Sequence, residues 1–181
     1  MIRTALITLL VTPLAVSSSS PTRESDYSAD VRSMESTLEA LYDVISGPAG
    51  AERDWDRFHH LFIPEGARLI PLGPARDDGE LALRVYDPAG YAERSAPFFE
   101  QSGFYESEIH REVQEFGRLV HVFSTYEGRR EEGGEVFLRG INSIQLLHER
   151  DRWWIVSIYW EPEAQGNPLP ARYLPPSDSG R

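Results

Sequence analysis

Residues 136–160 contain two apolar stretches separated by five polar residues, and this pattern constrains the fold more than any other in the chain. The first stretch, 136–147, is rich in aliphatic and β-branched residues, and the second, 153–160, has the sequence WWIVSIYW. Polar residues 148–152 are typical of a hairpin tip. We therefore predict two antiparallel strands joined by a tight turn.

A turn in which Glu149 pairs with Arg152 would make both faces of this hairpin apolar. One face would carry Asn142, Ile144, Leu146, Trp153, Ile155, Ser157 and Tyr159, and the other Ile141, Ser143, Gln145, Leu147, Trp154, Val156, Ile158 and Trp160. A strand pair that is apolar on both sides must be covered on both sides. We expect helices on one face and either a partner subunit or the chain's own tail on the other.

Helical periodicity predicts three helices in the N-terminal half of the chain. The first begins at Ser28 and ends before Gly47-Pro48, the second follows Asp54 as its N-cap, and the third follows Asp87-Pro88. The apolar stripe of the first helix is predicted to comprise Val31, Met34, Leu38, Leu41, Tyr42 and Ile45.

Four further strands are predicted at residues 67–72, 81–85, 108–116 and 119–126. Gly117-Arg118 suits a two-residue hairpin turn, because glycine accepts a positive φ at the first turn position. Helices followed by a run of antiparallel strands indicate an α+β domain. We expect about six strands in a curved sheet, with the helices closing one face.

The first 17 residues have the features of a secretory signal peptide. Arg3 supplies a positive end, residues 5–11 form an apolar core, and Ala15-Val16-Ser17 resembles a cleavage site. Such a segment is too short to remain as a membrane anchor. We expect a secreted or periplasmic chain that begins near Ser18 and has no membrane insertion after signal removal.

The remainder divides into a flexible lead-in (18–27), one domain (28–160) and a Pro-rich tail (161–181). Leu169, Tyr173 and Leu174 are suited to anchoring that tail on an exposed apolar face. The formal net charge of -11 argues against nucleic acid and anionic membranes as partners, because both would repel the chain.

Residues 118–160, which include RLVHVFSTYEG, RGINSIQLLHERD and RWWIVSIYW, resemble the nuclear transport factor 2-like superfamily, and most closely its SnoaL-like bacterial branch. The resemblance extends over residues 28–160. It implies a cone-shaped antiparallel or mixed sheet, a pocket closed by helices, and a homodimer formed through the outer face of the sheet. Because the superfamily includes isomerases, cyclases, dehydratases and proteins without known activity, it implies no particular reaction.

One candidate for chemistry is a carboxylate and an imidazole on the hairpin that turns at residues 117–118. Its register makes Glu112 and His121 diagonal neighbours on a polar face, about 7–8 Å apart. A carboxylate beside an imidazole raises the pKa of the ring and gives an acid/base pair. Either this face or the opposite one, which includes Val120 and Tyr126, lines the pocket. If the opposite face does, the polar face is the solvated outside of the sheet.

Further candidates are polar or aromatic residues suited to lining a small-molecule pocket. The predicted ligand-binding residues are Tyr42, Trp55, His59, Asn142, Trp153 and Tyr159. Tyr42 and Asn142 would supply hydrogen bonds. We predict no metal site, because His59 and His60 cannot face one ion from a helix, and no cofactor, because no nucleotide-binding motif is present.

These features favour an exported domain that binds a small, mostly apolar molecule. A first alternative is a cofactor-free acid/base enzyme, an isomerase, cyclase or dehydratase, that uses Glu112 and His121 or the hydrogen-bonding groups of Tyr42 and Asn142. A second alternative is a structural or assembly protein that acts through the apolar outer face of the sheet.

Overall fold

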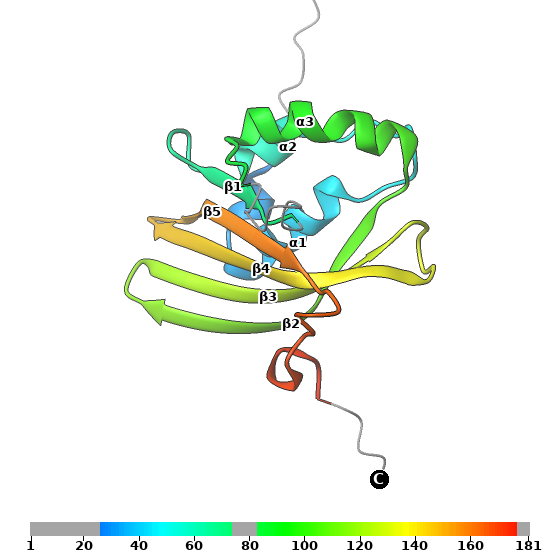
Figure 1. The fold of residues 1–181 in the computed structure, drawn as a ribbon. Coiled ribbons are helices and arrows are strands. Elements are labelled where there is room, and N and C mark those ends of the chain that lie inside the picture. The colour runs from blue at the N-terminus through cyan, green and yellow to red at the C-terminus, as the bar shows by residue number, and fades with distance from the viewer. Residues whose placement is uncertain (1–25, 74–82, 177–181) are drawn as a thin grey trace, which may run out of the picture.

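A five-stranded mixed sheet with three helices on one face forms the fold (Figure 1). The computed structural model describes residues 26–73 and 83–176. The strands are β1 (Arg68–Pro71), β2 (Tyr105–Phe116), β3 (Leu119–Arg129), β4 (Val136–Glu149) and β5 (Arg152–Pro162), in the order β1-β5-β4-β3-β2. The helices are α1 (Met34–Ile45), α2 (Trp55–His60) and α3 (Pro88–Gln101), with 3-10 turns η1 (Ser28–Val31) and η2 (Ala171–Tyr173). The predicted α+β architecture is confirmed.

The sheet has five strands rather than about six, because residues 83–85 do not form a strand. Leu83 and Val85 are exposed, and Tyr86 makes only an isolated bridge to Leu69. Alternating apolar residues form a strand only where one face can be buried, and here neither side chain finds cover. The signal peptide, most of the lead-in and residue 81 lie outside the described residues.

The second and third helices begin at their predicted caps, whereas the first begins later than predicted, because residues 28–31 form a separate 3-10 turn and α1 starts at Met34. Ser33 and Ser36 form a capping box at the start of α1. Asp54 caps α2 and Asp87 caps α3, where Pro88 occupies the first turn and the helix continues through Pro97. No helix among the described residues is long and apolar enough to cross a membrane.

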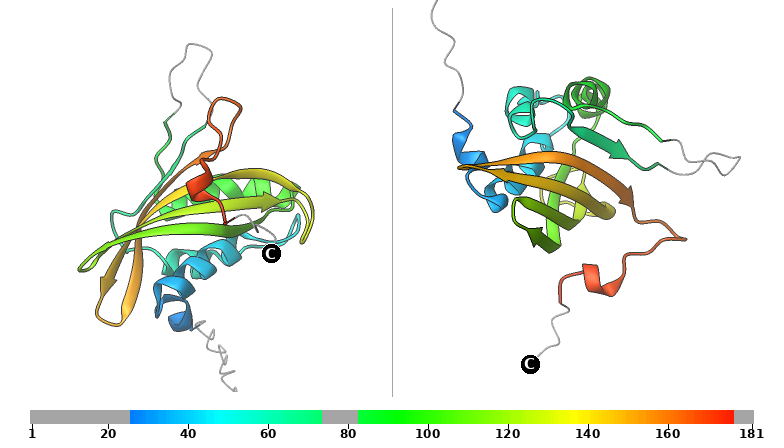
Figure 2. Two further views of the ribbon diagram at one scale, coloured as in Figure 1. Left: turned by 90° about the horizontal axis from the view of Figure 1, so that it is seen from below. Right: turned by 90° about the vertical axis from the view of Figure 1, so that its left-hand side faces the viewer.

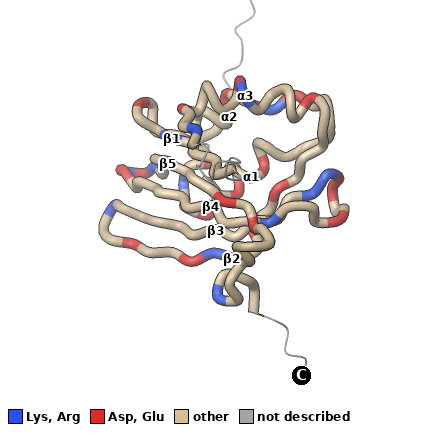
Figure 3. The backbone as a smooth tube through the Cα atoms, viewed as in Figure 1, with Lys and Arg blue, Asp and Glu red and all other residues tan. Residues whose placement is uncertain are grey.

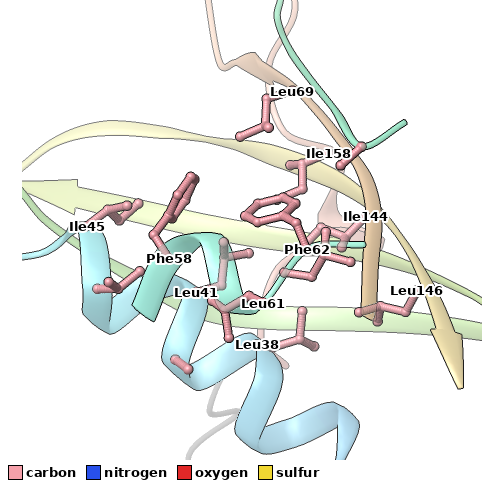
Figure 4. Packing of buried hydrophobic residues seen from close by; sticks show 14 of the residues in the cluster. Leu38, Leu41, Ile45, Phe58, Leu61, Phe62, Leu69, Ile144, Leu146 and Ile158 are labelled. Carbon is pink, nitrogen blue, oxygen red and sulfur yellow. The ribbon is translucent and has the colours of Figure 1, made fainter. Parts of the chain in front are cut away.

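The core lies between the helices and the inner face of the sheet. Figure 4 shows the side chains of α1 and α2 directed at those of the strands, and the labelled residues are Leu38, Leu41, Ile45, Phe58, Leu61, Phe62, Leu69, Ile144, Leu146 and Ile158. The predicted stripe of the first helix supplies much of this cluster, since Val31, Leu38, Leu41, Tyr42 and Ile45 are all buried. Charged residues of both signs are spread along the chain (Figure 3).

Strand pairing among the described residues is irregular at three places, and the two in β5 and β2 decide which of their side chains face the helices. Glu149 pairs with Arg152 as predicted, but Val156 has no partner between the Gln145–Ser157 and Leu146–Ile155 pairs. Beyond this bulge the alternation of β5 is inverted. The prediction that Tyr159 shares a face with Asn142 is therefore wrong, and Trp160 takes that place.

A second bulge lies in β2, where Ile109 is left without a partner between the pairs made by Glu108 and His110. The bulge places Glu106 and Glu108 on the same inner face as Arg111. Strict alternation from Arg111 would have placed both carboxylates outside.

The C-terminal segment crosses the outer face of the sheet, on the side opposite the helices (Figure 2). The ring of Tyr173 packs against Phe123 with centroids 5.0 Å apart, and Thr125 Oγ1 donates a hydrogen bond to the carbonyl oxygen of Tyr173 at 2.6 Å. Part of this apolar face is thus covered by the chain's own tail, one of the two predicted covers. The homodimer through this face stays a prediction.

Arg53 joins the loop after α1 to α3. It is only 5% exposed, and its guanidinium donates hydrogen bonds to the carbonyl oxygens of Ile45, Gly47 and Ala51 while lying 4.8 Å from the ring centroid of Phe99. These carbonyls lie at or just beyond the end of α1, where they have no helical partner. One buried cation therefore satisfies the end of the helix that carries Tyr42.

We expect Arg53→Met to lower the free energy of unfolding by about 3 kcal/mol, because it leaves several buried carbonyl oxygens without donors while keeping an apolar contact with Phe99. Urea unfolding followed by circular dichroism measures this change. Arg94→Met, at an exposed position of α3, is the control and should change stability by less than about 0.5 kcal/mol. Equal stabilities for the two variants would contradict the role of Arg53.

Candidate active site

A cavity of about 110 Å³ lies between α1, α3 and the inner face of the sheet. Most of its wall is apolar and comes from Leu41, Ile45, Phe58, Leu69, Phe104, Leu138, Ile158 and Trp160. Five polar residues complete the lining: Tyr42, Tyr91, Glu106, Tyr126 and Asn142. An apolar pocket with a few converging polar groups is the usual form of a small-molecule site.

Among the described residues that line this cavity, Glu106 is the only acidic one. Burial raises the pKa of its carboxyl from 4.5 to about 7, and a hydrogen bond from Asn142 Nδ2, 3.3 Å from Oε1, offsets part of the rise. A carboxyl with a pKa near neutrality exists in both protonation states at physiological pH. It can therefore accept a proton and return it.

A chain of hydrogen bonds fixes the orientation of Tyr42. The Ser124 hydroxyl donates to the Glu108 carboxylate, which is also ion-paired with Arg111. Because its proton is used there, Ser124 accepts the hydrogen bond from the Tyr42 hydroxyl at 2.6 Å. Asn142 Nδ2 donates to the same Tyr42 oxygen at 3.0 Å. The proton of Tyr42 is thus directed away from the cavity.

The hydroxyl of Tyr126, unlike that of Tyr42, is not held by hydrogen bonds to other described residues. Its side chain is only 1% exposed, yet among the described residues its hydroxyl has no hydrogen-bond partner. The ring lies over Gly140, where an added Cβ would stand 2.5 Å from the phenolic oxygen, so glycine makes room for it. Burial, and then the charge of Glu106, raise the pKa of Tyr126. This phenol is a protonated donor available to a ligand.

Tyr91 extends from α3 toward the same carboxyl. Burial and then Glu106 raise the pKa of Tyr91 to about 12, against the opposing effect of a hydrogen bond with Ser95. Its ring stacks on Phe58 and meets Trp160 edge to face. Three tyrosines therefore surround one carboxyl inside an apolar wall.

A polar cleft of about 550 Å³ between α1 and β2 adjoins the cavity. Tyr42 and Glu106 line both spaces, and the cleft also includes Asp43, Glu108 and Arg111. Glu106 is partly exposed to solvent. A molecule whose apolar end fills the cavity can extend its remaining atoms into the cleft.

The predicted acid/base pair lies outside this site. Glu112 and His121 are on the outer face of the sheet, Glu112 is exposed, and His121 Nε2 lies 2.9 Å from Ser143 Oγ rather than bonding to Glu112. The reason is alternation: Val120 and Val122 face the core, so the residue between them points outward. The opposite face of this hairpin lines the cavity.

The predicted ligand-binding residues are only partly brought together. Tyr42 and Asn142 line the cavity. Trp55 packs against Phe58 and Phe99 outside it, and His59 is exposed. Trp153 stacks on His148 near the far hairpin tip, with ring centroids 4.6 Å apart. Tyr159 is 46% exposed on the outer face, because of the bulge at Val156.

Glu106, Tyr91 and Tyr126 line the cavity but were not predicted as site residues from the sequence. Only Tyr126 left a usable signal, since it shares a face with Val120 and Val122 in strict alternation. Glu106 precedes a bulge that no pattern marks, and Tyr91 reaches the site from a separate helix. Within residues 26–73 and 83–176, no group of three or more His, Cys, Asp or Glu side chains is placed to hold a metal ion.

No protein-family model and no curated protein matches the chain. Similar solved structures include an NTF2-like protein of unknown function from Silicibacter pomeroyi DSS-3, at 13% identity over 71% of this chain and 92% of that chain (TM-score 0.44). Another, from Shewanella baltica OS155, has 14% identity over 74% and 98% (0.40). The CaMKII hub of S. rosetta has 17% identity over 71% and 89% (0.42). All three TM-scores are below 0.5, so this similarity carries no argument about a family, a ligand or a reaction.

The raised pKa of Glu106 predicts a specific dependence of stability on pH. Its folded pKa of about 7 exceeds the ordinary 4.5, so its stabilising contribution is present below pH 4.5 and is lost as the pH rises through 7. Glu106→Gln cannot ionise and removes this loss. The free energy of unfolding of the variant, taken relative to that of the parent, should therefore rise by about 3 kcal/mol as the pH is raised from 4.5 to 8.

Chemical unfolding at a series of pH values measures that difference, and Glu112→Gln, at an exposed outer position, is the matched control. If the free energies of unfolding of Glu106→Gln and Glu112→Gln depend on pH in the same way, the prediction of a raised pKa for Glu106 is wrong.

Proposed function

We propose that the chain is an enzyme that transfers a proton to or from a small, mostly apolar molecule bound in the cavity, with Glu106 as the general base and acid. The observation that carries this proposal is one carboxyl with a pKa of about 7, set in an apolar wall that also holds the phenol of Tyr126, which has no hydrogen-bond partner among the described residues. Binding alone would need the apolar wall but no titrating carboxyl.

The arrangement suits a carbonyl compound with a proton on the neighbouring carbon. The Glu106 carboxylate removes that proton, and the electron pair moves to the carbonyl oxygen to give an enolate. The Tyr126 hydroxyl donates a hydrogen bond to this oxygen and stabilises its charge. The neutral Glu106 carboxyl then returns the proton to carbon, at the original or another position. Asn142 holds Glu106 in place through its amide.

The size of the cavity limits the substrate. An engineered protein cavity of about 150 Å³ holds benzene, so about 110 Å³ accepts a small ring or a short branched chain. Larger substrates would place their remaining, more polar atoms in the cleft beside Tyr42 and Glu106.

Deuterium exchange at the carbons next to the carbonyl of cyclopentanone, followed by proton NMR in D₂O, tests the proposal. We expect the protein to accelerate exchange, with a rate that rises with pH and levels off above about 7, because the ionised carboxyl is the base. Glu106→Gln should lower the rate at least 100-fold, and Tyr126→Phe about 10- to 100-fold.

Glu112→Gln and His121→Ala are the controls, because both positions face away from the cavity. They should leave the exchange rate unchanged. If cyclopentanone binds, as a thermal shift would detect, but exchange is no faster than in buffer, the chain is a binding protein and the catalytic proposal is overturned. Loss of exchange in His121→Ala alone would move the chemistry to the outer face.

A further inference from the structure

On the outer face of the sheet, a small side chain lies between two large aromatic side chains on three adjacent strands. Phe123 on β3 pairs with Ser143 on β4, which pairs with Tyr159 on β5. Neighbouring strands lie about 4.8 Å apart, so the two aromatic side chains begin about 10 Å apart with only a serine between them. The Ser143 hydroxyl bonds with His121 Nε2.

This backbone separation leaves room for a flat ring between the two side chains. A ring in van der Waals contact with a wall on each side needs about 7–8 Å between those walls. Phe123 and Tyr159 supply the walls, and Ser143, which is 7% exposed, supplies the floor. The Tyr159 hydroxyl has no hydrogen-bond partner among the described residues.

Residues 163–173 of the C-terminal segment form a roof over this part of the outer face, and both ends of the roof are anchored to the sheet. At one end the Glu163 amide donates to the Arg139 carbonyl oxygen at 2.7 Å, and the Glu163 carboxylate pairs with the Arg139 guanidinium at 2.8 Å. At the other end Tyr173 bonds to Thr125 and packs on Phe123. Leu169 is tied in between by its amide, which donates to Glu163 Oε1 at 3.0 Å.

Under this roof lies a hollow of about 300 Å³, lined by the ring walls, by Ile141 and Leu72, and by Leu169 and Tyr173 of the tail. Protein segments that pack together normally leave few voids larger than a water molecule. Here the anchors at both ends keep the roof above the sheet. The volume lies at the lower limit of small-molecule pockets.

We propose that this hollow is a second small-molecule site, which binds a flat molecule of one or two fused aromatic rings between Phe123 and Tyr159. The site is on the face of the sheet opposite Glu106 and does not depend on the proposed proton transfer. Ring stacking and burial beneath the tail would supply the affinity, and the Ser143 and Tyr159 hydroxyls and the charged Glu161 and Arg172 at its edge would meet polar substituents.

Calorimetric titration of the full chain with 2-naphthol tests the proposal, because the inner cavity of about 110 Å³ is too small to enclose two fused rings. Decahydro-2-naphthol is the matched ligand control, since it has the same skeleton and hydroxyl but is not flat. We expect one saturable 2-naphthol site and at least fivefold weaker binding of the decahydro compound.

Two variants locate the site. Tyr159→Ala removes a wall at an exposed position, and Ser143→Leu fills the slot; each should weaken 2-naphthol binding at least fivefold while the thermal unfolding transition is retained. Phe116→Ala, on an exposed part of the same face, and Glu106→Gln should leave the affinity within twofold. Absence of saturable binding, equal affinity for the two compounds, or binding that survives both Tyr159→Ala and Ser143→Leu would each overturn the proposal.

Discussion

The strict alternation of side chains along a β-strand is the constraint on which both sides of this sheet depend. Between Val120 and Val122 the alternation is regular, so His121 must point away from the core. The alternation is inverted where a residue has no cross-strand partner, and two such residues, Ile109 and Val156, lie in the strands that supply Glu106 and Trp160. The first inversion turns Glu106 inward and the second turns Trp160 inward. The positions of Glu106 and Trp160 in the candidate active site are therefore set by one extra residue in β2 and one in β5.

Placing a carboxyl in that interior has an energetic cost that the surrounding groups only partly offset. Asn142 is the one hydrogen-bond donor that lowers the pKa of Glu106, while burial raises it. The shorter hydrogen bonds belong to the adjacent hydrogen-bond network that links Glu108, Ser124 and Tyr42. This network satisfies its own buried polar groups but leaves the charged form of Glu106 poorly stabilised. Destabilised groups of this kind are characteristic of functional sites, where stability is exchanged for reactivity.

Much of the fold was accessible from the sequence because it rests on local patterns. The register at Glu149–Arg152, the buried stripe of α1 and the caps at Asp54 and Asp87 all follow from residue types at short spacing. The site was less accessible. Tyr42 and Asn142 were found because they lie on regular elements, whereas Glu106 and Tyr159 lie beyond bulges that have no signature in the sequence. Residues 83–85 of the strand predicted at 81–85 do not form a strand, because alternation does not guarantee a partner.

The bulge at Val156 and the pairing of β4 also mean that residues adjacent in sequence belong to different compartments. Asn142 faces the inner cavity and Ser143 faces the hollow beneath the tail; Ile158 and Tyr159 divide in the same way. The two compartments share one backbone wall, one peptide thick. A single-residue insertion or deletion in β4 would exchange their linings, so length changes in this strand should be far less tolerated than substitutions.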